Sequence, residues 1–277
     1  MIFLLIFLSF FPVSYQKNIP FNAGSVFDLE SFEVENFNYL NLPDLSADAV
    51  FIKEINGKVL FGKNVEKQKD IASLTKLMSS FLGYTLFSSQ EDFIFDKESI
   101  DQEGNVGYFR IGERISRDDI LKASLVASSN DAIYLLAKTY SVDKFVNLMN
   151  QKAQEWKMSK TSFVDPTGLG KNFSTARDLS LMLTKIYSQT PEIFNFTKDE
   201  KIIINGKILW TTNLLLHKYS SIIVGAKTGY KESAGENLAM ILKFDSSPFI
   251  NVVILNSQNR FEDAEKIIKA LKNYYER

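Results

Sequence analysis

Three short groups of polar residues contain most of the chemistry available to this chain of 277 residues. In chain order they are Ser73-Leu74-Thr75-Lys76, Ser128-Ser129-Asn130 and Lys227-Thr228-Gly229. A serine hydroxyl becomes a nucleophile when a neighbouring base removes its proton. The set supplies a nucleophile, two candidate proton carriers, an amide and a cation for a carboxylate. It predicts serine acyl transfer that needs no histidine.

Ser73 stands where a strand-rich segment gives way to an amphipathic helix, and Lys76 follows three residues later. Residues three apart share a helix face, so the amine is expected one turn from the hydroxyl. A helix N-terminus also stabilises an oxyanion. A lysine acts as a base when its pKa falls from about 10.4, which burial or a second cation such as Lys227 would cause. The Ser-x-x-Lys pairs at Ser14 and Ser141 are not followed at a suitable distance by the other motifs.

The second and third motifs are expected on a loop and on a strand. Ser128-Ser129-Asn130 interrupts two helical patterns, so Ser128 can pass a proton and Asn130 can hold a substrate amide. Helix capping is the alternative role for these residues. Lys227-Thr228-Gly229 ends an apolar run, where an edge strand can pair with an extended peptide. Lys227 and Thr228 suit a terminal carboxylate, and a solvated strand end is the alternative.

The elements that must position these motifs follow from hydrophobic periodicity. Strands come first, then many helices, and then strands again before a closing helix. The expected strands are 50–54 and 59–62, a small hairpin over 202–210, and 222–229, 237–244 and 249–256; the expected helices start near Leu74, Ser116, Asp131, Phe145 and Thr175. Such segregation predicts an α+β fold. Its antiparallel sheet of about five strands would join both chain ends and pack against a helical middle, about 86–200.

Composition narrows the classes of function. A formal net charge of −1 gives no electrostatic footprint for nucleic acid. The absence of cysteine excludes thiol catalysis, disulfides and cysteine-based zinc sites. One histidine, His217, lies in an apolar run, which favours a structural role. No cluster of His, Asp and Glu has the spacing of metal ligands, so neither a metal nor a cofactor is implied.

The N-terminal part is expected to lie outside the catalytic domain. Residues 1–16 are mostly apolar but shorter than the roughly 20 residues that span a bilayer. They fit a signal peptide or an anchor tethered through residues 1–13, although no basic residue precedes the run and no Ala-x-Ala site follows it. A buried N-terminal strand or helix is the alternative. Residues 17–46 are predicted to be an acidic linker, and residues 47–277 the catalytic domain.

With these residues in place, the chain from 47 to 277 resembles the low-molecular-mass penicillin-binding proteins, the serine D-alanyl-D-alanine carboxypeptidases. Four segments carry the resemblance: 71–78 around Ser73, 125–132 around Ser128, the Phe-Val-Asp-Pro-Thr-Gly-Leu run at 163–169, and 227–238. The resemblance implies the β-lactamase/DD-peptidase-like transpeptidase fold. It also implies hydrolysis through an acyl-enzyme, without metal or cofactor.

The resemblance assigns a role to each site residue. Ser73 would be the acylated nucleophile, Lys76 its general base and Ser128 a proton relay. The substrate would be bound by Asn130, Lys227, Thr228, Gly229, Tyr230 and Arg260, with the backbone N–H groups of Ser73 and Tyr230 forming the oxyanion hole. Without the resemblance, Arg260 is a surface residue at a helix start. Ser129 departs from the family pattern, in which glycine is common.

The implied function is removal of the terminal D-alanine from peptidoglycan stem peptides, outside the cytoplasmic membrane, with β-lactams as covalent inhibitors. The alternative is a D-Ala-meso-diaminopimelate endopeptidase that cuts cross-links, because the chain stops at Arg277 without the C-terminal β-domain and anchor helix of many carboxypeptidases. A class A β-lactamase is disfavoured because no Glu-x-x-Leu-Asn occurs between Ser128 and Lys227. The intact Ser73, Lys76 and Lys227 argue against an inactive sensor module.

Overall fold

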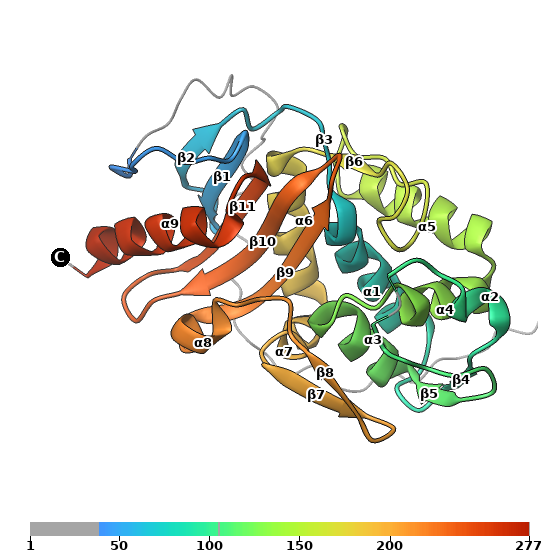
Figure 1. Ribbon diagram of the computed structural model, residues 1–277. Helices are drawn as coiled ribbons and strands as arrows, with labels where there is room; N and C mark the ends of the chain where they lie inside the picture. The colour runs from blue at the N-terminus through green and yellow to red at the C-terminus, as the bar shows by residue number, and fades with distance from the viewer. Residues whose placement is uncertain (1–38, 105, 277) are drawn as a thin grey trace, which may run out of the picture. The chain divides into compact units, whose positions relative to one another are not determined.

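A five-stranded antiparallel sheet joins the two ends of the chain in this computed structural model, which describes residues 39–104 and 106–276 (Figure 1). The strand order is β2-β1-β11-β10-β9. These strands are β1 (Ala49–Glu54), β2 (Val59–Lys63), β9 (Ile223–Lys231), β10 (Gly235–Lys243) and β11 (Phe249–Ser257). The predicted α+β class and the sheet built from both chain ends are confirmed. Strand β9 lies at the sheet edge.

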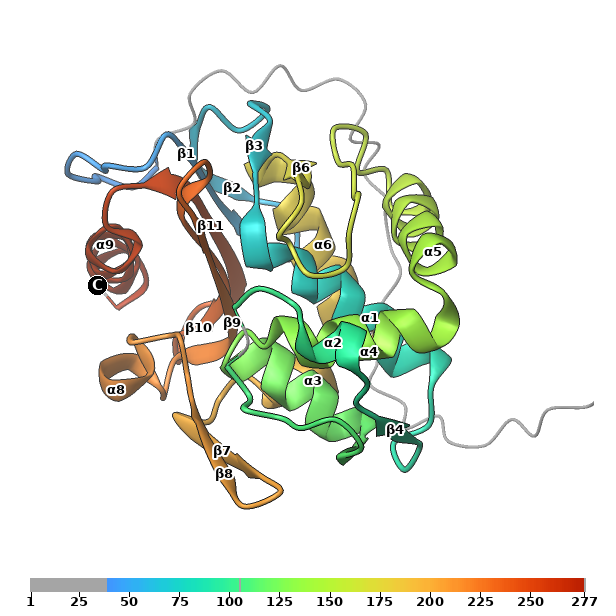
Figure 2. The same ribbon diagram turned by 45° about the vertical axis from the view of Figure 1, so that its right-hand side comes forward.

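Helices cover both faces of this sheet, which explains its nearly continuous apolar strands. Successive side chains of a strand point to opposite faces. In β11, Val253 and Leu255 belong to the core that contains α6 (Ala176–Gln189), whereas Val252 and Ile254 belong to the core that contains α9 (Arg260–Tyr275). Figure 2 shows these two helices on opposite sides of the sheet.

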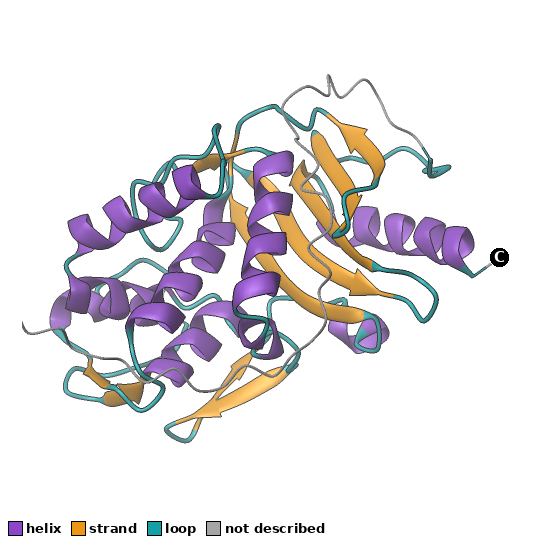
Figure 3. Ribbon diagram, turned by 180° about the vertical axis from the view of Figure 1, so that it is seen from behind, coloured by secondary structure: helices purple, strands orange, loops and turns teal. Residues whose placement is uncertain are grey.

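The helical layer lies on the α6 side of the sheet (Figure 3). Its helices are the 3-10 turn η1 (Ala72–Leu74), α1 (Thr75–Leu86), α2 (Lys97–Ile100), α3 (Arg117–Val126), α4 (Asn130–Tyr140), α5 (Val142–Glu155) and α7 (Glu192–Asn195). A short helix, α8 (Leu216–Tyr219), precedes β9. Two predicted helix starts are confirmed, because Ser116 Oγ accepts from Asp119 N and Thr175 Oγ1 accepts from Asp178 N. Ser141 occupies the N-cap position of α5, although its side chain makes no capping hydrogen bond.

Three short hairpins or ladders complete the described chain. They are β3 (Lys69–Asp70) with β6 (Phe173–Ser174), β4 (Asp92–Ile94) with β5 (Arg114–Ser116), and β7 (Lys201–Ile204) with β8 (Lys207–Trp210). The third was predicted from its Asn-Gly turn, where Asn205 and Gly206 both have positive φ. The first was not predicted, and it matters most. It brings the segment before Ser73 alongside the loop that ends at Phe173.

The predicted signal or anchor, residues 1–16, lies outside the described residues, as does the predicted linker up to residue 38. Residues 39–46 contact the rest of the domain: Leu40 and Leu45 are buried in the α9 core, and Ser46 Oγ donates to Asp263. The domain boundary at residue 47 stays a prediction. Within 39–104 and 106–276, no helix has both the length and the apolar character needed to cross a bilayer.

Candidate active site

Ser73 lies in η1, immediately before α1, and the residue before it has an unusual backbone. Ala72 has a φ of +46°, a left-handed conformation that costs a non-glycine residue roughly 1–3 kcal/mol. Hydrogen bonds hold it there: its N–H donates to Asp70 Oδ1 (3.2 Å), and its carbonyl accepts from Thr75 Oγ1 (2.7 Å). The nucleophile candidate is therefore carried on a backbone that its surroundings constrain on both sides.

Lys76 is fully buried, and its Nζ has three hydrogen-bond partners. They are Ser73 Oγ at 3.0 Å, Asn130 Oδ1 at 2.6 Å and the Thr167 carbonyl at 2.6 Å. The last two are carbonyl oxygens, which can only accept. A neutral amine has two hydrogens and one lone pair. Donation to both carbonyls leaves the lone pair for the Ser73 hydroxyl, so the geometry suits removal of that proton.

Burial lowers the pKa of Lys76 to about 7, while the Asp165 and Asp131 carboxylates act in the opposite direction. The expected effect of burial is therefore confirmed, since desolvation of Lys76 itself produces the shift, whereas the expected contribution of the Lys227 cation is wrong. The electrostatic repulsion acts on Lys227 instead. Its pKa lies well below the usual value because of burial first, and then because of the cations of Lys76 and Arg260.

The predicted loop between two helices is confirmed for Ser128 and Ser129, whereas Asn130 is already the first residue of α4. The three residues divide the capping and site roles. Ser129 Oγ accepts from Ala132 N (3.2 Å) and caps α4. Ser128, with a φ of +61°, lies with its Oγ 3.0 Å from Lys227 Nζ. Asn130 accepts from Lys76 and donates from Nδ2 to the Glu103 carbonyl (2.7 Å). Capping therefore leaves the Ser128 and Asn130 side chains available to the two lysines.

Lys227-Thr228-Gly229 lies inside edge strand β9, not at its end as predicted, because Tyr230 and Lys231 still pair with β10. Lys227 is fully buried, and its Nζ donates to Ser128 Oγ and to the Thr228 carbonyl (2.8 Å). Thr228 Oγ1 lies 2.5 Å from Thr212 Oγ1. The structure thus brings the third motif to the second through a direct side-chain contact.

Gly229 sits where a side chain has no room. A Cβ built on it would lie 2.9 Å from the Ile71 carbonyl oxygen and 3.2 Å from the Ser73 amide nitrogen. Glycine lets one backbone approach another closely. Strand β9 therefore passes directly against the backbone of the nucleophile candidate. The neighbouring Tyr230 side chain is 64% exposed.

Arg260 is the first residue of α9, and its guanidinium lies against strand β9. Its Nη1 donates to the Gly229 carbonyl (2.9 Å), and its backbone N–H donates to Glu236 Oε2 (2.9 Å). The structure therefore places this helix-start residue next to the third motif. Its side chain is only 13% exposed, so the alternative of an ordinary surface residue is wrong, whereas carboxylate binding remains a prediction.

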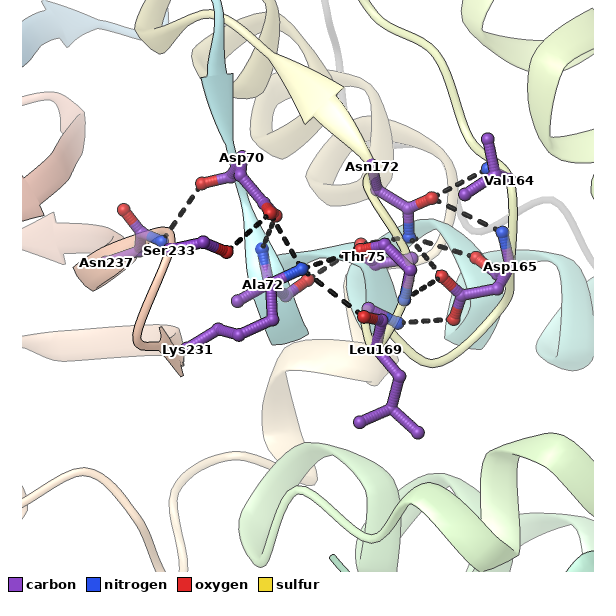
Figure 4. A network of polar contacts seen from close by, with 12 residues as sticks. Asp70, Ala72, Thr75, Val164, Asp165, Leu169, Asn172, Lys231, Ser233 and Asn237 are labelled. Carbon is purple, nitrogen blue, oxygen red and sulfur yellow. Dashed lines mark hydrogen bonds and ion pairs between the residues drawn. The ribbon is translucent and has the colours of Figure 1, made fainter. Parts of the chain in front are cut away.

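The loop 164–170, already noted in the sequence as part of the resemblance, has a role in the site that the sequence did not indicate (Figure 4). The Asp165 carboxylate accepts the N–H groups of Thr167 (2.7 Å), Gly168 (2.8 Å) and Gly170 (2.7 Å). This fixes the Thr167 carbonyl that receives Lys76. At Gly168, with a φ of +91°, a Cβ would lie 2.2 Å from the Ala72 carbonyl oxygen. The Asp-Pro-Thr-Gly turn was visible in the sequence, but the direction of its carbonyl was not.

Two further observations concern other residues. Thr212, also missed, donates its N–H to the Val126 carbonyl (3.0 Å) and so ties the segment after β8 to the end of α3.

His217 lies at the surface with its Nδ1 3.0 Å from Glu200 Oε1. Across 39–104 and 106–276, no three His, Asp or Glu side chains gather as metal ligands would.

Comparisons with known proteins identify the family to which this chain belongs. A family model described as D-alanyl-D-alanine carboxypeptidase matches residues 38–259. The D-alanyl-D-alanine endopeptidase of Pseudomonas aeruginosa is 34% identical over 241 residues, which cover 82% of this chain and 77% of that protein. The D-alanyl-D-alanine carboxypeptidase DacC of Escherichia coli is 28% identical over 251 residues, which cover 82% of this chain and 61% of that protein.

Solved structures show the same fold. Penicillin-binding protein D2 from Listeria monocytogenes, in its cefotaxime-bound form, matches with a TM-score of 0.74 and 28% identity. The match covers 82% of this chain and 98% of that chain. A D-alanyl-D-alanine carboxypeptidase from Mycobacterium tuberculosis matches in fold with a TM-score of 0.78 at 21% identity. The predicted DD-peptidase-like fold is confirmed.

Proposed function

Because the chain belongs to the D-alanyl-D-alanine carboxypeptidase family, we propose that it is a serine peptidase that hydrolyses peptidoglycan stem peptides ending in D-alanyl-D-alanine. The observation that carries this proposal is the environment of Lys76. Its buried Nζ has two carbonyl acceptors and the Ser73 hydroxyl as partners, with a pKa of about 7. That combination suits a general base at neutral pH.

In the acylation step, Ser73 Oγ attacks the carbonyl carbon of the penultimate D-alanine while its proton passes to Lys76 Nζ. The backbone N–H groups of Ser73 and Tyr230 hold the oxyanion, and such donors contribute about 3–4 kcal/mol each. The C–N bond then breaks, and the leaving nitrogen takes a proton through Ser128, which contacts Lys227. Water resolves the ester and releases the shortened stem peptide.

Substrate recognition is assigned to the edge strand. An extended peptide can add to β9 through main-chain hydrogen bonds. Lys227, Thr228 and Arg260 supply the cations and the hydroxyl for the terminal carboxylate, and Asn130 supplies an amide for the substrate backbone. Gly229 allows the close approach of β9 to Ser73 that this arrangement requires.

The endopeptidase alternative stays open because relatives of both kinds are similar to this chain. Product analysis on purified muropeptides separates the two. Free D-alanine from monomeric pentapeptides supports trimming of stem peptides. Monomers released from cross-linked dimers support cutting of D-Ala-meso-diaminopimelate cross-links.

Fluorescent penicillin and a diacyl D-Ala-D-Ala peptide test the proposal directly. The purified protein should be labelled stably by the first and should release D-alanine from the second. Ser73→Ala should do neither, whereas Ser188→Ala, at an exposed site on α6, should match wild type. Labelling of Ser73→Ala at the wild-type rate would eliminate the assigned nucleophile. Rapid destruction of penicillin would favour a β-lactamase, and labelling without D-alanine release a sensor module.

The proposed setting is outside the cytoplasmic membrane, where peptidoglycan lies. The sequence of residues 1–16 supports export, either by signal cleavage or by anchoring through residues 1–13. A reporter enzyme that works only outside the cytoplasm, fused after residue 38, should be active. An inactive, correctly synthesised fusion would contradict the proposed location.

A further inference from the structure

One face of edge strand β9 makes three successive contacts with the site. Alternate residues of a strand point the same way, so Lys227, Gly229 and Lys231 share a face. Lys227 reaches Ser128 on one side of the nucleophile candidate. Gly229 lies against the Ser73 backbone. Lys231, which the proposed reaction does not use, lies two residues further along.

The ammonium of Lys231 joins three oxygen atoms from two other segments (Figure 4). Its Nζ lies 2.7 Å from Asp70 Oδ2 and donates to the carbonyls of Gly170 (2.8 Å) and Leu169 (3.3 Å). Three donors meet three acceptors, which uses the full capacity of an ammonium group. The side chain of Asp70 is 8% exposed and that of Lys231 is 24% exposed. This is therefore a largely buried junction and not an ordinary surface ion pair.

The Asp70 carboxylate connects this junction to the nucleophile. Its Oδ1 accepts the N–H of Ala72, whose left-handed backbone directly precedes Ser73. Its Oδ2 accepts from Ser233 Oγ (3.3 Å), a residue of the β9–β10 turn. Lys231 thus neutralises the carboxylate that holds the constrained residue beside the reacting hydroxyl.

The two carbonyls connect the junction to the base. Leu169 and Gly170 end the loop that Asp165 organises, and Gly170 N–H donates to Asp165 Oδ2. The same loop presents the Thr167 carbonyl to Lys76 Nζ. Movement of the loop end away from β9 would therefore change the direction in which Lys76 presents its lone pair.

We propose that Lys231 is a positioning residue for acylation. By joining β9 to the Asp70–Ser73 segment and to the 165–170 loop, it sets the spacing between the backbones of Ser73 and Tyr230 and the orientation of Lys76. It touches neither the substrate nor the reacting atoms. The inference rests on the proposed function, since it concerns the rate of that acylation.

Lys231→Met tests this against a matched control, Lys243→Met. Lys243, on neighbouring strand β10, also donates to three carbonyls, those of Phe244, Asp245 and Ser247, but at the turn before β11. The acylation rate constant and the dissociation constant of the noncovalent complex are measured with penicillin in rapid-mixing experiments. Lys231→Met should lower the rate constant about tenfold to a hundredfold, as small misplacements do, and leave the dissociation constant unchanged. Lys243→Met should acylate like wild type.

Asp70→Asn provides the second arm and keeps the shape of the side chain. It should slow acylation by a similar factor, and the double variant should be no slower than the slower single variant, because both remove one junction. An acylation rate constant equal to that of the wild type in Lys231→Met or in Asp70→Asn would overturn the inference. So would equal slowing by Lys243→Met, or multiplicative effects in the double variant. A wild-type protein that fails to acylate would instead contradict the proposed function.

Discussion

None of the three hydrogen-bond partners of Lys76 is charged, and the residue is fully buried. A charged ammonium in such surroundings loses hydration that two carbonyls and a hydroxyl replace in part. The neutral amine is therefore accessible near pH 7, and its lone pair faces Ser73. The chemistry follows from an environment that sequence spacing alone does not specify.

Acylation should consequently depend on pH through this amine. Because burial lowers the pKa of Lys76 to about 7, the protonated form prevails below that value and has no lone pair. The rate constant for penicillin acylation should rise with pH and level off above about 7, falling about tenfold per unit at lower pH. Rapid-mixing measurements from about pH 5 to about pH 9 check this. A rate that is constant or decreases as pH rises through 7 would contradict the role of Lys76.

Gly229→Ala should slow acylation without unfolding the protein. The added Cβ would approach the Ile71 carbonyl oxygen to 2.9 Å and the amide nitrogens of Ser73 and Leu74 to 3.2 Å. These are backbone atoms, so β9 must move away from the oxyanion site. The measured acylation rate should fall by about a hundredfold. Circular dichroism should show retained secondary structure, and an unchanged rate would show that the close approach is dispensable.

Sequence reasoning found the side chains of this site but not its main-chain partners. Ser73, Lys76, Ser128, Asn130 and Lys227 were recognisable by type and order. In the structure, hydrogen bonds join Lys76 to Ser73 and Asn130, and Lys227 to Ser128. The Thr167 carbonyl could not be recognised in the sequence, because every residue has a backbone carbonyl. Its direction depends on Asp165 hydrogen bonds that form after the loop closes.

At the scale of elements, strand β9 illustrates what periodicity can and cannot show. Its apolar part was predicted, but Tyr230 and Lys231 end it with polar side chains and still pair with β10. Main-chain pairing continues regardless of side-chain hydropathy. The ladder of β3 with β6 was missed for a related reason: two residues are too few to show a period.

Asp165→Asn should destabilise the 164–170 loop and slow acylation together. The carboxylate accepts three backbone N–H groups and the Thr167 hydroxyl, whereas an amide has one acceptor oxygen. Hydrogen bonds to charged groups contribute about 1.5–3 kcal/mol each, so a loss of roughly 2–3 kcal/mol in unfolding free energy is expected. Urea titration measures it, alongside penicillin acylation.

Thr175→Ala is the matched control for that loop variant. It removes the α6 cap, in which Thr175 Oγ1 accepts from Asp178 N, and should cost about 1 kcal/mol. Since α6 supports the sheet without contacting Ser73 or Lys76 through a hydrogen bond in the described chain, acylation should be unaffected. Equal acylation losses in both variants would show that the loop acts through general stability alone.

For the whole molecule, the sheet requires both ends of the chain. Strand β1 pairs with β11, with Ala49 opposite Leu255, so most of the chain must be in place before this ladder closes. Contacts between residues far apart in sequence slow folding. The order of strands, helices and strands allowed this topology to be predicted, whereas the exact strand neighbours came from the structure.

Asp263→Ala should weaken the junction of these chain ends. This buried carboxylate accepts from Ser46 N (2.9 Å), Ala47 N (2.9 Å), Ser46 Oγ (2.8 Å) and Ser257 Oγ (2.7 Å). Its removal leaves buried donors without partners, at a cost of about 1–3 kcal/mol each. The unfolding free energy in urea should fall by about 4 kcal/mol or more, with penicillin acylation retained below the unfolding transition. An unchanged free energy would show that the junction adds nothing to the fold.

The most direct test of a lysine-activated serine enzyme is to trap its intermediate on a peptide that ends in D-alanyl-D-alanine. Rapid acid quenching followed by digestion and mass spectrometry should locate the acyl group on Ser73, with one D-alanine released for each acyl group formed. Lys76→Met should leave Ser73 unmodified on the same time scale. An acyl group on another residue, or release of D-alanine by Ser73→Ala at the wild-type rate, would contradict the account.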